Sequence, residues 1–384
     1  MIVIDPILRA SRLQMTVRAI KAANQNGVRP ILLTAKNRIA ESGLEEYGGL
    51  DFAVDEVFSV PDGFWYGKLG LINALKLIAY LARRDKPDFI YVVGVNEWHP
   101  FSVIFVACAF LCAKIVFADY NPPWPHQGEQ GSASPSLRSR LVSFLYKSVW
   151  AANKRAKVLI FDERIDTRSI GRDGSVVWLP DPPPAQLLGL KIDPDQNSPI
   201  DGRYMLLVGT QSKRKGLHRV VRLAREEPHL FSKIGWVLAG RLTEDTLELE
   251  SDLQRLCDLG QMHWINRRLS EEELFRIYSG AYFTVIPYDK EFTGSSGVLV
   301  SSSFVSTPVI ASSHGLIGAR VRKNRLGICF NAGSPDSFKL AVKQVVEMPP
   351  ESYRNLAKSA CEYGETVSNS RHIEGLKSLM FGAQ

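Results

Sequence analysis

The chain has 384 residues, of which 45% are hydrophobic and 23% are charged, so its composition is that of a globular protein and excludes general disorder. This length exceeds one ordinary domain and predicts two domains of roughly 150 to 200 residues each. The formal net charge of +7 favours acidic ligands or an anionic surface. Because the basic residues are dispersed and no aromatic-basic stacking motif is present, we expect no nucleic-acid binding.

The sequence also indicates a compartment. Residues 1–5 read as a strand and lack the features of a signal peptide, and we therefore expect a cytoplasmic protein. The most apolar stretch, residues 101–113, is about 13 residues long, whereas a membrane span needs roughly 20. Five cysteines without zinc-ligand spacing fit a reducing compartment.

Apolar strands alternate with helices along the first half of the chain. The pattern predicts strands at 2–4, 30–34, 89–95, 115–118, 158–161 and 176–179, and helices at 11–26, 71–84 and 101–112. Such alternation is typical of a parallel sheet with helices on both faces. Residues 180–184 and 192–200 are rich in proline and interrupt the pattern, and we place an interdomain linker at 183–202.

The second half repeats this alternation. It predicts strands at 204–208, 235–239, 263–265, 283–287, 308–312 and 327–330, and helices at 217–226, 243–259, 270–279, 298–304, 335–348 and from 351 onward. We therefore predict an α/β protein of two Rossmann-like, doubly wound domains that face each other across a cleft. The domains are residues 1–182 and 203–350, and we expect a C-terminal helical segment, 351–384, to pack back on the first domain.

A glycine- and serine-rich turn at 294–297 follows a predicted strand and precedes a predicted helix. Gly294 and Gly297 allow close approach of the backbone to a ligand, and the helix at 298–304 would direct its free amides and positive dipole end at a phosphate. Upstream, residues 208–216 (VGTQSKRKG) lead from a strand into a cationic loop. The two loops together predict a site that holds a diphosphate between a helix dipole and a lysine.

Five segments between residues 204 and 330 resemble the donor domain of group 1 (family 4) glycosyltransferases, which have the GT-B fold. In order along the chain they are LLVGTQSKRKG, WVLAGRL, MHWINRRLSEEELFRIYSGAYFTVIPY, EFTGSSGV and STPVIASSHGLIG. The first half is more loosely similar to the acceptor domain, through PDFIYVVGVNEWH and KIVFADYNPPWP. The resemblance implies transfer of a sugar from a UDP- or GDP-linked donor to an acceptor hydroxyl, with the nucleotide sugar as substrate and no cofactor.

The resemblance also implies which residues bind the donor. Lys215 matches the family's diphosphate-binding lysine, whose charge would stabilise the leaving diphosphate. Thr210 replaces the companion arginine, so Lys213, Arg214 or the backbone amides of 294–298 are candidates for that role. The expected donor-binding residues are Gly209, Thr210, Lys213, Arg214, Lys215, Gly240, Arg241, Ile265, Asn266, Tyr288, Glu291, Thr293, Gly294, Ser295, Ser296, Gly297 and Val298.

The chain departs from the family at two glutamates. Thr293 and Ser301 stand at the positions of the paired glutamates of the donor domain, and Glu291, close to the first, is a candidate contact for sugar hydroxyls. No carboxylates cluster near the diphosphate loop, and the Asp-x-Asp pattern at 193–195 lies between prolines in the linker. We therefore expect no metal site and an activity that survives chelation.

Three residues of the first domain are candidates for catalysis. Asp119, near the position of the family's acceptor-domain histidine, has a carboxylate of reference pKa about 3.9 that would accept the acceptor's proton in an inverting transfer. In a retaining transfer it would only orient hydroxyls, and the structural alternative is that it caps the following loop. Glu97 and His99, which follow the strand at 89–95, are further candidates.

The acceptor side begins with a loop at 120–136 that is rich in Pro, Gly and Ser. Within it, Tyr120, Trp124 and His126 are candidate contacts for an acceptor glycan, glycolipid or small molecule. The helix predicted at 137–157 has no acidic residue and carries basic residues every seven positions, at 140, 147 and 154. It fits either a core-packed helix with a solvated basic edge or peripheral contact with anionic lipid at the inner face of a membrane.

We interpret the chain as a cytoplasmic, metal-independent glycosyltransferase that builds a polysaccharide, glycolipid or glycosylated natural product. Two alternatives stay open. The loss of both glutamates and the change at Asp119 also fit a catalytically silent protein that binds a nucleotide sugar or a partner. A nucleotide-sugar epimerase of the same architecture would consume the donor without an acceptor.

Overall fold

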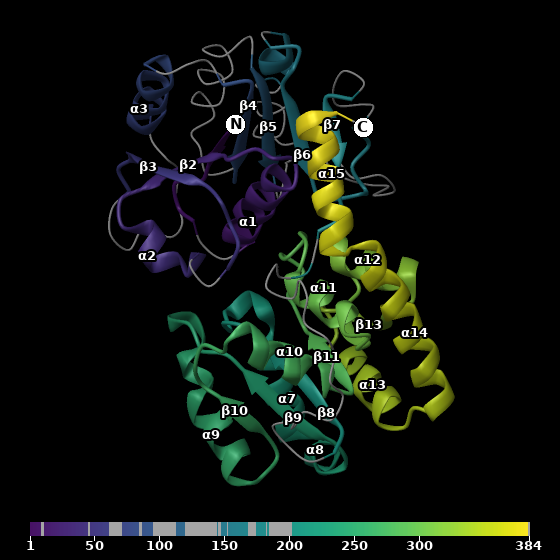
Figure 1. The fold of residues 1–384 in the computed structure, drawn as a ribbon. Helices are drawn as coiled ribbons and strands as arrows, with labels where there is room; N and C mark the ends of the chain where they lie inside the picture. The colour runs from purple at the N-terminus through teal and green to yellow at the C-terminus, as the bar shows by residue number, and fades with distance from the viewer. Residues whose placement is uncertain are drawn as a thin grey trace. The chain divides into compact units, whose positions relative to one another are not determined.

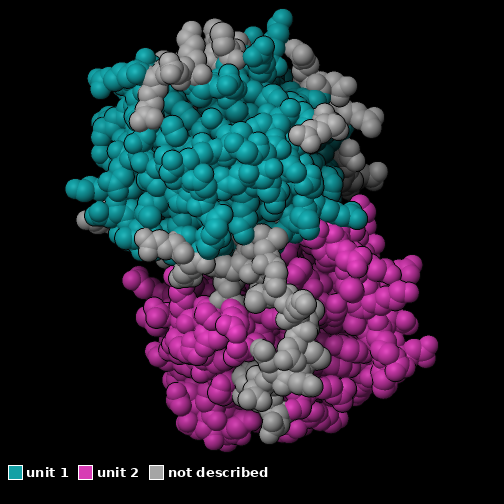
Figure 2. Space-filling model, in the orientation of Figure 1, with its two compact units in different colours: residues 1–180, 369–384 teal, residues 181–368 magenta. Residues whose placement is uncertain are grey.

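The computed structural model of the chain divides into two compact units (Figures 1 and 2). Unit 1 contains residues 1–180 and 369–384, and unit 2 contains residues 181–368. The described residues are 1–8, 11–44, 47–60, 71–83, 87–94, 113–119, 144, 147–151, 153–167, 174–181, 183 and 202–382. The C-terminal segment predicted at 351–384 is divided between the units, because α14 (Pro350–Thr366) belongs to unit 2 and α15 (Asn369–Phe381) to unit 1.

Unit 1 is built on a seven-stranded parallel sheet with the order β3-β2-β1-β4-β5-β6-β7. Its strands are β1 (Ile2–Ile4), β2 (Ile31–Ala35), β3 (Ala53–Phe58), β4 (Phe89–Val93), β5 (Lys114–Asp119), β6 (Lys157–Ile160) and β7 (Val176–Trp178). The central strands are buried apolar runs, in which Val3 of β1 pairs with Leu32 and Tyr91. Strand β3 was not predicted, because Asp55 and Glu56 interrupt its apolar pattern at the edge of the sheet.

The described helices of unit 1 are α1 (Ser11–Asn24), α2 (Arg38–Ser42), α3 (Leu71–Ala82) and α15. Helix α15 packs along α1 (Figure 1), and Arg18 Nε donates a hydrogen bond of 2.8 Å to Asn369 Oδ1. His372 Nδ1 lies 2.8 Å from the Pro180 carbonyl, and burial lowers the pKa of His372 to about 3, so this imidazole is neutral. The end of the chain is thereby fixed to unit 1. The helix predicted at 101–112 lies outside the described residues.

Unit 2 contains a six-stranded parallel sheet with the order β10-β9-β8-β11-β12-β13. Its strands are β8 (Tyr204–Val208), β9 (Gly235–Ala239), β10 (His263–Ile265), β11 (Phe283–Ile286), β12 (Val309–Ser312) and β13 (Gly327–Phe330). In a parallel sheet all carboxyl ends lie at one edge, and the strand order reverses between β8 and β11. Ligands of such sheets bind where the loops after these two strands diverge.

Helices cover both faces of the unit 2 sheet. One core contains residues of α7 (Leu217–Glu226), α8 (Pro228–Lys233), α9 (Glu250–Asp258) and α13 (Pro335–Val346). The cores on the other face contain residues of α10 (Glu271–Ser279), α11 (Gly297–Phe304), α12 (Gly315–Asn324) and α14. The helix predicted at 243–259 is a 3-10 helix (Glu244–Leu249) followed by α9. The two doubly wound sheets confirm the predicted α/β fold class.

Candidate functional site

Three loops at the carboxyl edge of the unit 2 sheet contact one another through glycines. Gly209 (φ 89°) and Gly240 (φ 148°) follow β8 and β9, and a Cβ added at Gly240 would lie 2.3 Å from the Gly209 carbonyl oxygen. At Gly216 (φ 73°), a Cβ would lie 1.8 Å from the carbonyl oxygen of Pro287, in the loop after β11. A side chain would prevent these approaches, so the glycines allow the loops after β8, β9 and β11 to touch through their backbones.

Lys215 lies where these loops meet. It belongs to a 3-10 turn (Lys213–Lys215) before α7, and its Nζ is 5.9 Å from the centre of the Tyr288 ring. A Cβ added at Gly209 would lie 2.8 Å from this Nζ, so the side chain turns back over the loop after β8. Burial, with a smaller contribution from Arg214, lowers the pKa of Lys215 to about 8. Among the described residues no carboxylate pairs with this ammonium, and an anion bound beside it would stabilise its charged form.

The turn at 294–297 leads into α11, which begins at Gly297. Gly297 is exposed and Gly294 half-buried, whereas Ser296 is buried with its hydroxyl 3.5 Å from that of Tyr288. Ser296 is the N-cap residue of α11, and its side chain makes no cap hydrogen bond. The first amides of this helix therefore lack a side-chain acceptor at the N-cap, and the exposed Gly297 leaves space for an anion there.

Two residues that were not predicted from the sequence, Asp181 and Arg320, form hydrogen bonds with Ser295 in this turn. The Ser295 hydroxyl donates to the carboxylate of Asp181 and accepts a hydrogen bond of 3.0 Å from Arg320 Nη1. Arg320, in α12, is only 2% exposed. Neither residue carries a local signal, because Asp181 stands in a proline-rich run and Arg320 in a basic segment typical of a solvated helix face.

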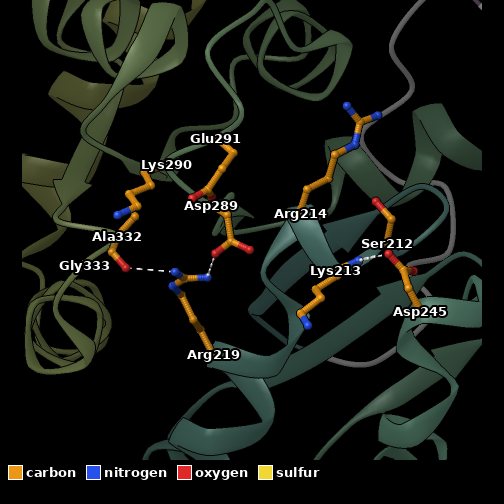
Figure 3. Close-up of a pocket in the computed structure, with 10 residues that line it drawn as sticks. All are labelled: Ser212, Lys213, Arg214, Arg219, Asp245, Asp289, Lys290, Glu291, Ala332 and Gly333. Atoms are coloured by element: carbon orange, nitrogen blue, oxygen red, sulfur yellow. Dashed lines mark hydrogen bonds and ion pairs between the residues drawn. The ribbon is translucent and has the colours of Figure 1, made fainter.

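The loop that carries Lys215 also borders a pocket of about 690 Å³ (Figure 3). The residues that line it follow β8, β9, β11 and β13 or lie in α7, and they are Ser212, Lys213, Arg214, Arg219, Asp245, Asp289, Lys290, Glu291, Ala332 and Gly333. Three of the predicted donor-binding residues, Lys213, Arg214 and Glu291, thus line one pocket. The other pocket residues were not predicted.

The basic residues of the pocket differ in their partners, because Arg219 is ion-paired whereas Lys213 and Arg214 are exposed. Figure 3 shows Arg219 between the Asp289 carboxylate, with which it forms an ion pair, and the Ala332 carbonyl, which accepts a hydrogen bond of 2.8 Å. Arg219 therefore ties the loops after β11 and β13 to α7. Lys213 and Arg214 are exposed, with the Arg214 guanidinium 5.2 Å from the centre of the Phe292 ring, so both can meet an anionic ligand.

The remaining predicted donor residues lie along the same edge of the sheet. Thr210, Arg241 and Asn266 are exposed in the loops after β8, β9 and β10, Val298 is half-buried in α11, and the Ile265 carbonyl accepts a hydrogen bond of 3.1 Å from the Gly240 amide. Thr293 is exposed, and its carbonyl accepts from the Leu316 amide at 3.0 Å. Ser301, inside α11, is 5% exposed and therefore presents almost no surface to a ligand.

In unit 1 the structure describes only one of the candidate catalytic residues. Asp119 is the last residue of β5 and is 2% exposed, which fits a capping role as well as that of a shielded base. Glu97, His99, Tyr120, Trp124 and His126 lie outside the described residues. Asp5, which was not predicted, is buried at the same edge of the sheet, where it accepts hydrogen bonds from the Leu8 amide (2.8 Å) and the Thr16 hydroxyl (2.7 Å).

Two negative findings apply to the described residues alone. No three His, Cys, Asp or Glu side chains in this part of the chain are grouped so that they would hold a metal ion. None of its helices combines the length and the apolar character needed to cross a bilayer.

Solved structures share this architecture along the whole chain. A glycosyltransferase from Rickettsia africae matches with a TM-score of 0.66 and 12% identity, over 100% of this chain and 98% of that one. HepE (Alr3699) from Anabaena, in complex with UDP, matches with a TM-score of 0.64 and 14% identity, over 98% and 97%. WaaG, a glycosyltransferase involved in lipopolysaccharide biosynthesis, matches with a TM-score of 0.62 and 11% identity, over 100% of both chains. The chain therefore has the GT-B fold.

The sequence of the second unit matches a known protein family. Residues 191–363 match the family described as glycosyl transferases group 1. This region of the chain, which contains the three loops that touch at glycines and α11, is therefore similar to that family, and the match confirms the resemblance predicted from its motifs. No curated protein sequence gives a match to the chain.

Proposed function

We propose that the protein transfers a sugar from a nucleoside-diphosphate sugar to an acceptor hydroxyl, and that unit 2 binds the donor. The observation that carries this proposal is the environment of Lys215, a partly buried ammonium without a carboxylate partner among the described residues. It lies where the loops after β8 and β11 meet, at the reversal of strand order, and phosphorylated ligands of parallel sheets bind at such positions. The solved HepE complexes with UDP, with UDP and glucose, and with UDP-glucose support a uridine nucleotide as the first candidate.

The charge of the leaving diphosphate would be balanced by the chain itself. Lys215 supplies one full charge, and the amides at the start of α11 supply a partial charge from the helix dipole. Lys213 and Arg214, exposed at the pocket, would take the role of the family arginine that Thr210 replaces. Since these groups need no metal, transferase activity should be the same with and without a chelator, and its loss in EDTA with recovery on adding Mg²⁺ would contradict this account.

The sugar and the acceptor would be recognised by other groups. Glu291 is exposed at the rim of the pocket and is the candidate for binding sugar hydroxyls in place of the missing glutamates. Asp119 is the candidate base in unit 1 if the transfer inverts the anomeric centre. Asp119→Asn should then lower the transfer rate by 10²-fold or more, roughly the contribution of a general base, without changing donor affinity. An unchanged rate would remove the base role.

A thermal-shift panel of nucleoside diphosphates tests donor binding. A ligand that binds only the folded state at about 100 times its Kd stabilises that state by roughly 2.7 kcal/mol, which raises the melting temperature by a few degrees. UDP or GDP should produce this shift, and the matching nucleoside, which lacks the diphosphate, should not. No shift with any diphosphate, or equal shifts with the nucleosides, would refute the proposed site.

The absence of both family glutamates favours a second candidate function, that of a protein that binds a nucleotide sugar without transferring it. Thr293 and Ser301 offer no carboxylate, and Ser301 is buried. Release of free UDP from a UDP-sugar, with or without an acceptor, would exclude a silent protein. Conversion of the donor sugar into its epimer without release of nucleotide would identify an epimerase instead.

A further inference from the structure

The chain passes between the two units twice, and hydrogen bonds within unit 1 hold both passages. The first junction follows Pro180, and the second precedes Asn369. The Pro180 carbonyl oxygen lies 2.8 Å from His372 Nδ1, and Asn369 Oδ1 accepts a hydrogen bond of 2.8 Å from Arg18 Nε. Because His372 lies three positions after Asn369 in α15, and such positions are neighbours on a helix, the two junctions leave unit 1 close to each other.

In unit 2 the first junction is connected to the turn before α11. Asp181, the first residue of this unit, accepts a hydrogen bond from the Ser295 hydroxyl, which in turn accepts a bond of 3.0 Å from Arg320 Nη1. Asp181 is half-buried and Arg320 is 2% exposed, so both bonds are largely shielded from water. Hydrogen bonds to charged groups are stronger than neutral ones, and two of them meet at Ser295. The turn is therefore fixed to the residue at which unit 2 begins.

The second junction is connected to the same helix through α14. A Cβ added at Gly364 in α14 would lie 2.6 Å from the Ser303 carbonyl oxygen of α11, so the two helices touch through their backbones. The two segments also share one hydrophobic core, which contains Leu299, Val300, Tyr363 and Val367. Helix α11 is thus attached to the first junction at its start and to the second junction along its length.

We propose that Asp181 is a positioning residue for donor binding, which acts through Ser295 on the first amides of α11, and that a bound diphosphate in turn restrains both junctions. This inference rests on the donor site proposed above. A diphosphate that accepts hydrogen bonds from the amides at the start of α11 would restrict the turn, and a restricted Ser295 would hold Asp181 in place. Because such coupling is reciprocal, a change at Asp181 must also alter the affinity for the diphosphate.

Isothermal titration calorimetry on the full chain, with UDP or GDP, whichever binds, tests the positioning role. Asp181→Ala should weaken binding by about tenfold or more, the equivalent of one hydrogen bond to a charged group. Asp181→Asn keeps a side-chain oxygen that can accept the bond from Ser295, and its affinity should lie within about threefold of the wild type. Ser295→Ala removes the same bond from its other end and should also weaken binding, and adding Asp181→Ala to it should cause no further loss.

Hydrogen exchange of the same proteins tests the restraint of the junctions. In the wild type, the saturating diphosphate should slow exchange in peptides that contain residues 176–181 and in peptides that contain residues 363–372, because local opening at both junctions becomes less frequent. In Asp181→Ala, the saturating diphosphate should still slow exchange at 363–372, through α14, but should leave exchange at 176–181 unchanged. A role of Asp181 in folding alone would not separate the two junctions in this way.

The matched control is Asp258→Ala, which removes an exposed carboxylate that accepts a hydrogen bond of 3.0 Å from Gln254 elsewhere in unit 2. This variant should have the affinity and the exchange pattern of the wild type. Wild-type affinity in both Asp181→Ala and Ser295→Ala would overturn the inference, as would a bound diphosphate that slows exchange at neither junction of the wild type or at 176–181 of Asp181→Ala. If the wild type binds no nucleoside diphosphate, the proposed function itself is refuted, and this inference with it.

Discussion

The affinity for UDP should fall as the pH rises through 8, because the diphosphate binds the charged form of Lys215. In the free protein the pKa of this lysine is lowered to about 8, so its protonated fraction is about 0.9 at pH 7 and about 0.1 at pH 9. A bound diphosphate would raise this pKa, and binding above pH 8 would therefore require uptake of a proton. The expected loss between pH 7 and pH 9 is about tenfold, or roughly 1.4 kcal/mol. The diphosphate does not add to this slope, because its own last ionisation lies near pH 6.

Isothermal titration calorimetry at constant ionic strength measures this slope, with two variants as controls. Lys215→Arg keeps a charged group at all these pH values and should bind UDP with nearly constant affinity. Lys215→Met should bind more weakly at pH 7 by about 10- to 150-fold, the loss of a charge-assisted hydrogen bond of about 1.5 to 3 kcal/mol, and should show no slope. A wild-type affinity that is flat from pH 7 to 9, or the same slope in Lys215→Met, would refute the assignment of Lys215 to the diphosphate.

Three further predictions concern the same loops. Between pH 8 and 10.5 the folded state binds fewer protons at Lys215 than the unfolded state does. The free energy of unfolding, measured by denaturant titration, should therefore rise with pH in this window by up to about 3 kcal/mol. The same measurement on Lys215→Met should show no such rise. Gly216→Ala should lower the free energy of unfolding by about 2 to 4 kcal/mol and abolish UDP binding, because its Cβ would lie 1.8 Å from the Pro287 carbonyl oxygen. The control Gly260→Ala, at a glycine with φ 66° and open space around it, should lower the free energy of unfolding by only about 1 kcal/mol. Equal losses in the two variants would contradict the packing argument. Arg320→Met should lower the free energy of unfolding by about 1 to 3 kcal/mol and should also lower the affinity for UDP. The control Lys323→Met, at an exposed residue, should change neither quantity. Wild-type affinity in Arg320→Met would show that the hydrogen bond to Ser295 does not position the turn.

The regular parts of the fold were predictable because each is encoded locally. Buried parallel strands such as β4 and β8 are continuous apolar runs, and a short-range pattern is sufficient to find them. Edge strand β3 was not predicted, because it is half-exposed and carries two acidic residues. Helix α12 was not predicted because it begins at Gly315 and contains Gly318, and glycine disfavours a helix locally. Tertiary packing of Leu316, Ile317 and Val321 into the core compensates for this.

The candidate site was predictable only in part. Lys215 and the turn at 294–297 follow strand ends in the sequence, and the position of a loop at the carboxyl edge of a parallel sheet identifies them as ligand candidates. The hydrogen bonds that fix the turn were not predictable in this way, because Asp181 and Arg320 lie 114 and 25 positions from Ser295 along the chain. Contacts over such separations leave no periodic pattern, and only the folded chain reveals them.

A crystal structure of the protein with UDP tests the central claim most directly. The account predicts the pyrophosphate within about 3 Å of Lys215 Nζ and of the first amides of α11, with Arg320 still bonded to Ser295. A UDP molecule bound elsewhere, or at these loops with its pyrophosphate away from both Lys215 and α11, would contradict it.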